Sequence, residues 1–154
     1  MSDRELVNVD ANAVSHLERI EPRVEVLHVA VGVATVLMSR STAVRVKANE
    51  IDKGDVLGCA RIAGIQAAKR ATDLIPSVLP VSVGGVTVEF ELLEDRIEVT
   101  STVEAFDRTG VTMQALTASA VAALTIYDMC KAIDRSMVIT ALTLSNAQRD
   151  GASI

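Results

Sequence analysis

The sequence is poor in aromatic residues, with no Trp, one Tyr and two Phe among 154 residues. Nucleic-acid-binding domains commonly stack bases on aromatic rings and hold phosphates with an excess of basic side chains. This chain lacks that excess as well, because its formal net charge is −5. We therefore expect no nucleic-acid partner, and a core built from Ala, Val, Leu and Ile.

Long apolar runs and cysteine motifs are also lacking. The longest apolar stretch, Val26 to Met38, falls short of the roughly 18 residues that a membrane-spanning helix needs. The N-terminus turns acidic at Asp3 and carries no recognisable export signal. Cys59 and Cys130 fit no zinc or disulfide pattern, so we expect each to be a small buried apolar residue. These features predict a cytoplasmic protein with no membrane partner and no metal site.

What the chain does have is 49% hydrophobic residues in a length typical of one domain. No internal repeat, linker or low-complexity segment divides it. We expect a single domain over residues 1–154, in which 1–36 form a distinct N-terminal segment and 145–154 a mobile tail.

The hydropathy pattern predicts an α+β fold. Residues 24–37 are rich in Val and nearly all apolar, which is typical of a strand covered on both faces. Residues 86–92 and 97–105 alternate apolar and polar side chains around a short turn, which indicates a hairpin. A last strand is expected over 138–144, and residues 41–50 could form either a helix or an irregular link.

Two longer helices are expected between these strands. The first covers 56–72, with Asp55 as its N-cap and many Gly and Ala residues that permit close packing on a sheet or a partner subunit. The second covers 110–134, with Thr109 as its N-cap. One apolar series on it recurs at steps of three and four residues, so its members share a face: Met113, Leu116, Ala120, Leu124 and Tyr127. This order of elements predicts helices packed on one face of a mainly antiparallel sheet.

Few side chains suggest chemistry from spacing alone. Asp128 and Lys131 share a helix face, either as a surface ion pair or as an acid and a cation that meet an anionic ligand. A basic group near the first long helix allows the same alternatives, a solvated face or a phosphate site: Lys53, Arg61, Lys69 and Arg70. His28 lies inside the apolar strand, where we expect a hydrogen-bonded structural imidazole.

Two long motifs carry a resemblance to a known family. They are KGDVLGCARIAGIQAAKRATDLIP, residues 53–76, and DRTGVTMQALTASAVAALTIYDMCKAIDR, residues 107–135. With the hairpin between them they resemble the molybdenum cofactor biosynthesis protein C family, cyclic pyranopterin monophosphate synthase, over roughly residues 38–144. The segment before residue 36 is divergent.

The resemblance implies a ferredoxin-like fold in a homohexamer, a trimer of dimers, with active sites at subunit interfaces. It also implies a lyase that needs no cofactor. The small-molecule substrate would be a cyclised dihydroguanosine triphosphate, which is rearranged to the pterin product cyclic pyranopterin monophosphate with release of pyrophosphate.

The resemblance also implies site residues. Asp128 matches the family's catalytic acid/base, Lys131 lies beside it, and Lys53 matches the lysine of a KGD motif. Further substrate-binding positions are expected at Lys69, Ser77, Val78, Leu79, Thr112, Met113 and Gln114.

Several of these positions differ from the family's pattern. The family's Leu-Cys-His-Pro is Ser77-Val78-Leu79-Pro80 in this chain, and two family glutamates are Thr112 and Gln114. Since Leu and Val move no protons and Gln lacks a carboxylate, we predict weak or no turnover. The alternative is a catalytically silent homologue that binds a pterin or nucleotide ligand, or that assembles with an active paralogue.

Overall fold

The computed structural model describes residues 24–149 and 152–153. Its strands are β1 (Val26–Leu37), β2 (Val83–Leu92), β3 (Arg96–Asp107), β4 (Val138–Arg149) and β5 (Ala152–Ser153). Its helices are α1 (Arg40–Lys47), α2 (Val56–Lys69), α3 (Ala71–Leu74) and α4 (Thr112–Cys130). The main elements thus follow the order β–α–β–β–α–β, which is that of ferredoxin-like folds. None of the helices within these residues has both the length and the apolar character that a bilayer crossing requires.

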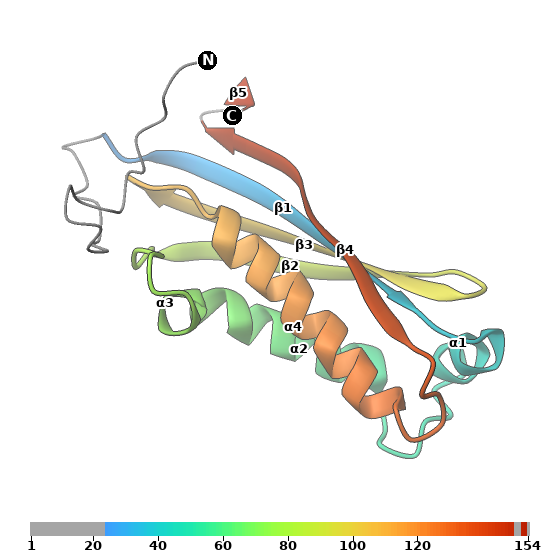
Figure 1. Ribbon diagram of the computed structural model, residues 1–154. Coiled ribbons are helices and arrows are strands. Elements are labelled where there is room, and N and C mark those ends of the chain that lie inside the picture. The colour runs from blue at the N-terminus through green and yellow to red at the C-terminus, as the bar shows by residue number, and fades with distance from the viewer. Residues whose placement is uncertain (1–23, 150–151, 154) are drawn as a thin grey trace, which may run out of the picture.

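The strands form one sheet in the order β2-β3-β1-β4-β5, and every neighbouring pair is antiparallel. Helices α2 and α4 lie side by side across one face of this sheet (Figure 1). The predicted α+β class, the antiparallel sheet and the helices on a single face are therefore confirmed. Helix α1 lies beyond the sheet's end, next to the β2–β3 turn, where Arg40 and Glu94 form a salt bridge of 2.8 Å.

Strand β1 differs from the prediction in how its faces are covered. Its side chains alternate between buried and half-buried, because α4 packs on one face only. Among the described elements no helix covers the opposite face of the sheet (Figure 1). The alternation along β1 puts Val29, Val31 and Val33 on that face. The expectation of a strand covered on both faces is therefore wrong for the isolated chain.

Strand β4 is longer than predicted. It continues beyond Leu144 to Arg149 and pairs with β1 through two irregularities in the register. Residues 145–149, which we expected in a mobile tail, thus belong to the sheet. Most of the N-terminal segment, His16 included, lies outside the described residues, as do positions 150, 151 and 154.

The two long helices begin differently. Helix α2 starts after Asp55, whose Oδ1 accepts a hydrogen bond from the Gly58 N–H at 2.8 Å, so the predicted cap is confirmed. The Thr109 cap is wrong, because α4 begins only at Thr112 and its N-cap residue Val111 makes no side-chain cap bond. The Val111 side chain is buried in the core, so tertiary packing sets this start.

Neighbouring residues in the sequence explain why α1 forms and where α3 ends. Of the two alternatives for residues 41–50, the structure has the helix α1, capped by the Ser39 hydroxyl. Helix α2 stops at Lys69, and the short α3 ends at Leu74, just before Pro76. Helix α4 ends at Cys130, before the predicted end at Asp134.

The predicted apolar series on α4 shares a face that lies only partly in the core. Leu116, Ala120 and Tyr127 are half-buried, whereas Met113 is exposed. Leu124 is 56% exposed. The reason is the close approach of α4 to β1, where a Cβ on Gly32 would lie 2.7 Å from the carbonyl oxygen of Ala115. Only short side chains fit most of this contact. The buried face of α4 therefore consists mainly of Ala115, Ala118, Ser119, Ala122, Ala123 and Ile126.

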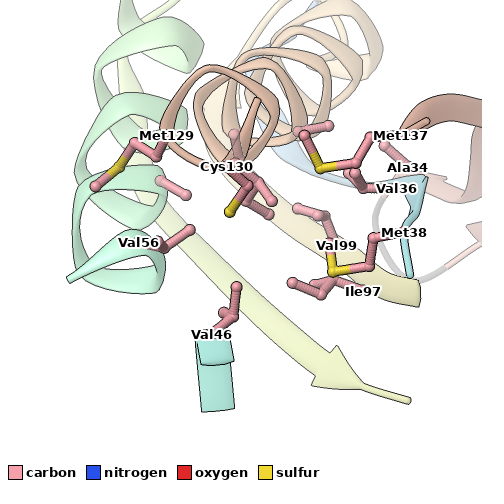
Figure 2. Close-up of a cluster of buried hydrophobic side chains, with 14 of the residues drawn as sticks. Ala34, Val36, Met38, Val46, Val56, Ile97, Val99, Met129, Cys130 and Met137 are labelled. Carbon is pink, nitrogen blue, oxygen red and sulfur yellow. The ribbon is translucent and has the colours of Figure 1, made fainter. Parts of the chain in front are cut away.

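The core is aliphatic, as the composition predicts. Figure 2 shows one buried cluster, in which sulfur-bearing side chains fill the space beside Val36, Ile97 and Val99: Met38, Met129, Cys130 and Met137. Flexible thioethers fill irregular gaps well where aromatic rings are scarce. Cys130 is buried as expected, but Cys59 is exposed, because α2 turns this position to solvent.

Candidate functional site

A carboxylate held between two lysines lies at the C-terminal end of α4. The Lys131 Nζ is 2.7 Å from Asp128 Oδ1, and the Lys53 Nζ is 3.1 Å from Asp128 Oδ2. Lys53 also donates to the Asp128 backbone carbonyl at 2.8 Å. The structure thus brings together the three residues to which the resemblance assigns the chemistry.

Local structure explains this arrangement. Asp128 and Lys131 are one helical turn apart, and the last backbone carbonyls of a helix attract cations. Lys53 comes from the loop between α1 and α2, where Gly54 adopts φ +96° and turns the chain toward the Asp55 cap. An L residue rarely adopts this conformation, so the glycine is required for the turn.

The lysines alter the protonation of the carboxylate. Hydrogen bonds from Lys131 and Lys53 and their charges lower the pKa of Asp128. The same hydrogen bond and the charge of Asp128 raise the pKa of Lys131. At neutral pH Asp128 is therefore an ionised carboxylate able to accept a proton, and Lys131 is a protonated ammonium able to donate one or to hold an anion.

A pocket of about 460 Å³ opens beside this group. Its lining is strongly cationic: Lys53, Tyr127, Lys131, Ala132 and Arg135. The Tyr127 ring gives it one apolar wall with a hydroxyl group. A volume of this size suits a small organic ligand, and the cations favour one that carries phosphates.

The other predicted substrate-binding residues lie at the opposite end of the molecule. Lys69 is exposed at the end of α2. In the loop before β2, Ser77 is exposed, whereas Val78 and Leu79 are half-buried. In the first turn of α4, Thr112 is half-buried, Met113 is exposed and Gln114 is buried.

The two ends are too far apart for one small ligand. Helices α2 and α4 run antiparallel, since Val56 shares a buried cluster with Cys130 and Ala68 shares another with Ala115. At 1.5 Å per residue, Gln114 and Asp128 are separated by about 20 Å along α4. One chain therefore presents two partial groups, the lysine end (Lys53, Asp128, Lys131) and the loop end (69, 77–79, 112–114), as the course of α4 in Figure 1 shows.

The predicted basic group near α2 does not form a single site. Lys53 belongs to the lysine end, and Lys69 and Arg70 lie at the other end of the helix. Arg61 is occupied elsewhere: its Nε donates to the Val88 carbonyl at 3.0 Å, and its guanidinium lies 5.3 Å from the centre of the Phe90 ring. Sequence proximity is misleading here because a helix of this length separates its two ends.

Sequence reasoning missed two residues next to the lysine end. Arg135 lies four positions after Lys131 and lines the same pocket. Asp134 is buried and accepts hydrogen bonds from the Ser136 N–H and hydroxyl at 3.0 Å and 2.6 Å. The pattern Asp-x-Ser is typical of a turn in which the carboxylate bonds the chain two residues on, and this signal was available in the sequence.

The expectation for His28 is half right. Its side chain is 5% exposed, as a structural histidine should be. However, neither ring nitrogen has a hydrogen-bond partner in the described part of the chain. Residues 24–149 and 152–153 also contain no group of three or more His, Cys, Asp and Glu side chains placed to hold a metal ion.

Most of the chain is similar to known proteins of one family. The MoaC family model matches residues 18–150, which extends upstream of the span indicated by the motifs and includes β1. A protein named cyclic pyranopterin monophosphate synthase from Novosphingobium aromaticivorans is 44% identical over 140 residues, 91% of this chain and 89% of that protein. Proteins of the same name are 53% identical over 117 residues in Heliobacterium modesticaldum (75% and 74% covered) and 41% identical over 139 residues in Clostridium perfringens (89% and 88%). The chain therefore belongs to the MoaC family.

Proposed function

We propose that this protein acts in molybdenum cofactor biosynthesis as a slow cyclic pyranopterin monophosphate synthase. It would rearrange a cyclised dihydroguanosine triphosphate to cyclic pyranopterin monophosphate and release pyrophosphate, a reaction that we place in the cytoplasm. The observation that carries the proposal is Asp128 held between Lys53 and Lys131 beside a cationic pocket. Three relatives that bear the name of this enzyme support the same reaction.

In this proposal the residues of the lysine end divide the work. The ionised Asp128 accepts a proton during the ring rearrangement; the two lysines keep this carboxylate ionised, and by lowering its pKa they also make it a weaker base. Lys131 stays protonated and, with Lys53, holds the phosphates as negative charge passes to the leaving pyrophosphate. The partial negative charge at the C-terminal end of α4 stabilises the ammonium groups of Lys53 and Lys131.

Slow turnover follows from the loop end. Leu79, Thr112 and Gln114 stand where the resemblance implies a histidine and two glutamates, and none of them is a general acid or base. Losing one such group typically lowers a rate by roughly 10²–10⁴-fold, although several losses in one site do not multiply. Gln114 is also only 3% exposed in the single chain.

We further propose that the site is completed in a homohexamer, a trimer of dimers. Because the two partial groups lie at opposite ends of α4, an antiparallel pair of chains would bring the loop end of one next to the lysine end of the other. A two-fold interface would build two such sites at once. The uncovered Val29, Val31 and Val33 of β1 and the exposed Met113 and Leu124 of α4 support burial against further subunits.

The test is the release of pyrophosphate from the cyclised triphosphate, measured beside the Novosphingobium aromaticivorans relative. We expect turnover about 10²-fold slower or more than that of the relative. Asp128→Asn should abolish it while the protein stays folded. A rate equal to the relative's would overturn the proposed slowness, and no release at all would overturn the proposed activity.

A restored variant sharpens the test. Leu79→His, Thr112→Glu and Gln114→Glu together should raise the rate, because they restore three side chains that can transfer protons. The first turn of α4 also favours carboxylates at 112 and 114. Asp128→Asn in the restored chain is the matched control and should remove the gain. If the folded restored hexamer stays inactive, the second candidate holds: a silent homologue that binds a pterin or nucleotide, or that assembles with an active paralogue. The substitutions at the loop end are the observation that favours this candidate.

A further inference from the structure

A buried carboxylate organises the loop that follows α4. Asp134 is 6% exposed, and both of its oxygens are used. Oδ2 accepts from the Ser39 N–H at 2.8 Å and from the Thr42 hydroxyl at 3.0 Å. Oδ1 accepts from the N–H and the hydroxyl of Ser136. We call Asp134 with its three partners, Ser39, Thr42 and Ser136, the Asp134 clamp.

The clamp joins parts of the chain that are far apart in sequence. Ser39 and Thr42 lie 95 and 92 residues before Asp134, at the N-terminus of α1. A few positions beyond Asp134, Met137 is buried in the core cluster of Figure 2. The loop between Lys131 and Met137 is therefore held at both ends and in its middle, which fixes the backbone position from which the exposed Arg135 side chain extends.

Positive charges outnumber negative charges around the pocket. Lys53, Lys131 and Arg135 contribute three cations to its lining, whereas both lysines share the single carboxylate of Asp128. Within the described ranges, none of the salt bridges includes Arg135. It is thus the pocket cation whose charge the described chain leaves available.

We propose that Arg135 is a third anion-binding residue of this pocket, which contacts the pyrophosphate part of the ligand and is positioned by the Asp134 clamp. The ligand class rests on the proposed function. The planar guanidinium binds two phosphate oxygens at once, which a lysine ammonium does not do with the same geometry. Lys53 and Lys131 remain beside Asp128, where protons move, and Arg135 holds the end of the phosphate chain away from the reacting ring.

The first test is calorimetric titration of the full-length protein with inorganic pyrophosphate. We expect Arg135→Gln to weaken binding by roughly 10–100-fold, the effect of losing a charge-assisted hydrogen-bond pair, and Arg135→Lys to weaken it less. The matched control is Arg96→Gln, which removes the same charge from an arginine already paired with Asp95 and Glu98. Equal affinity of Arg135→Gln and Arg96→Gln would overturn the proposal, as would a wild-type protein that does not bind pyrophosphate.

The second test addresses the clamp. Asp134→Ala should weaken pyrophosphate binding about as much as Arg135→Gln does, and the double variant should be no weaker than Arg135→Gln alone. Additive losses would overturn the positioning role, because residues that act through one another are not additive. The control for general destabilisation is Val103→Ala, which creates a cavity in the buried cluster that contains Ala68 and Ala115. This variant should have a lower melting temperature and an unchanged affinity for pyrophosphate.

These measurements are independent of turnover. If the wild-type protein binds pyrophosphate through Arg135 but releases none from the cyclised triphosphate, this inference stands and the proposed activity fails. If turnover is observed and Arg135→Gln binds pyrophosphate normally, the inference fails and the activity stands.

Discussion

Two aspartates near the end of α4 are stabilised as anions by different means. Asp128 is exposed and owes its lowered pKa to two ammonium groups. Asp134 is buried, and its pKa is lowered mainly by neutral donors, the Ser136 hydroxyl and the Ser39 N–H first among them. Several hydrogen bonds to a carboxylate outweigh the cost of its burial. The first aspartate is thus accessible to a ligand, whereas the second is enclosed by its own hydrogen-bond donors.

The clamp predicts a stability that depends on pH. Because the folded-state pKa of Asp134 lies below the unfolded value of about 3.9, its contribution is complete above that value and is lost as the pH falls below it. We expect Asp134→Asn to lower the free energy of unfolding by about 1–3 kcal/mol at pH 7. Urea unfolding between pH 7 and pH 2.5 should show a shallower acid-dependent loss for this variant than for the wild-type protein.

The exposed Asp73 on α3 supplies the control for this prediction. Asp73→Asn should leave the pH profile of unfolding unchanged. Parallel profiles for Asp134→Asn and the wild-type protein would contradict the assignment of acid sensitivity to the clamp.

At the scale of elements, the contact between α4 and β1 determines which side chains are buried. A Cβ on Gly32 would meet the Ser119 hydroxyl oxygen at 2.6 Å and the Ala115 carbonyl oxygen at 2.7 Å. Beside this contact, the Ser101 hydroxyl of the neighbouring strand β3 donates to the Ala115 carbonyl at 2.6 Å. The helix is therefore held against the sheet by short side chains and hydrogen bonds, and Leu124 is left outside.

Gly32→Ala should destabilise the protein by about 1–3 kcal/mol, because backbone atoms of α4 would have to move away from β1. Gly84→Ala is the matched control in another strand of the sheet. Its Cβ would lie 3.6 Å from the nearest atom, the Glu104 carbonyl oxygen, which is ordinary contact. We expect this variant to be as stable as the wild-type protein or slightly more so. Thermal unfolding of the two variants measures this difference in stability. Equal melting temperatures would contradict the proposed close contact between α4 and β1.

Elements set by local chemistry were predictable from the sequence. The Asp55 cap lies next to the helix it begins, and the alternation on both sides of residues 94 and 95 needs only the period of a strand. The start of α4 was not predictable, because it depends on where Val111 meets the core. The buried face of α4 was also missed, since hydrophobicity favours Leu124 over alanine and only the fold shows how little space Gly32 leaves.

The candidate site was predictable to a similar degree. The Asp128–Lys131 pair follows from helical periodicity. The contribution of Lys53, 75 residues earlier, comes from the antiparallel packing of α2 on α4, which spacing does not reveal. Asp134 contacts α1 across an even longer stretch of chain, so its partners could not be predicted, although its local turn could.

At the scale of the whole molecule, the sheet has one helix-covered face and one open face. The open face of β1 carries Val29, Val31 and Val33, opposite Glu104, Thr102 and Thr100 of β3. β-Branched apolar residues at the centre of an uncovered sheet are unfavourable in water and suit burial against another subunit. This face and the two separated ends of the site both favour an assembly.

Val31→Lys should therefore weaken the proposed assembly without disturbing the core, because the side chain points away from α4. We expect smaller particles by size-exclusion chromatography with light scattering, and a fall in pyrophosphate release. Val44→Lys is the matched control, since Val44 is 64% exposed on α1 and lies outside the sheet. A wild-type chain that is monomeric at micromolar concentration would overturn the assembly, and an unchanged particle size for Val31→Lys would remove this face from it.

The length of α4 has a genetic consequence in the proposed assembly. Because each chain contributes its lysine end to one catalytic centre and its loop end to another, a copy altered at both ends damages two centres, whereas a copy altered at one end damages only one. A cell that makes equal amounts of intact and Asp128→Asn, Met113→Lys chains would then lose more than half of its activity, which makes the doubly altered allele dominant over the normal one. By contrast, a pair of chains in which one carries only Asp128→Asn and the other only Met113→Lys would keep one intact centre. These two alleles would therefore partly complement each other.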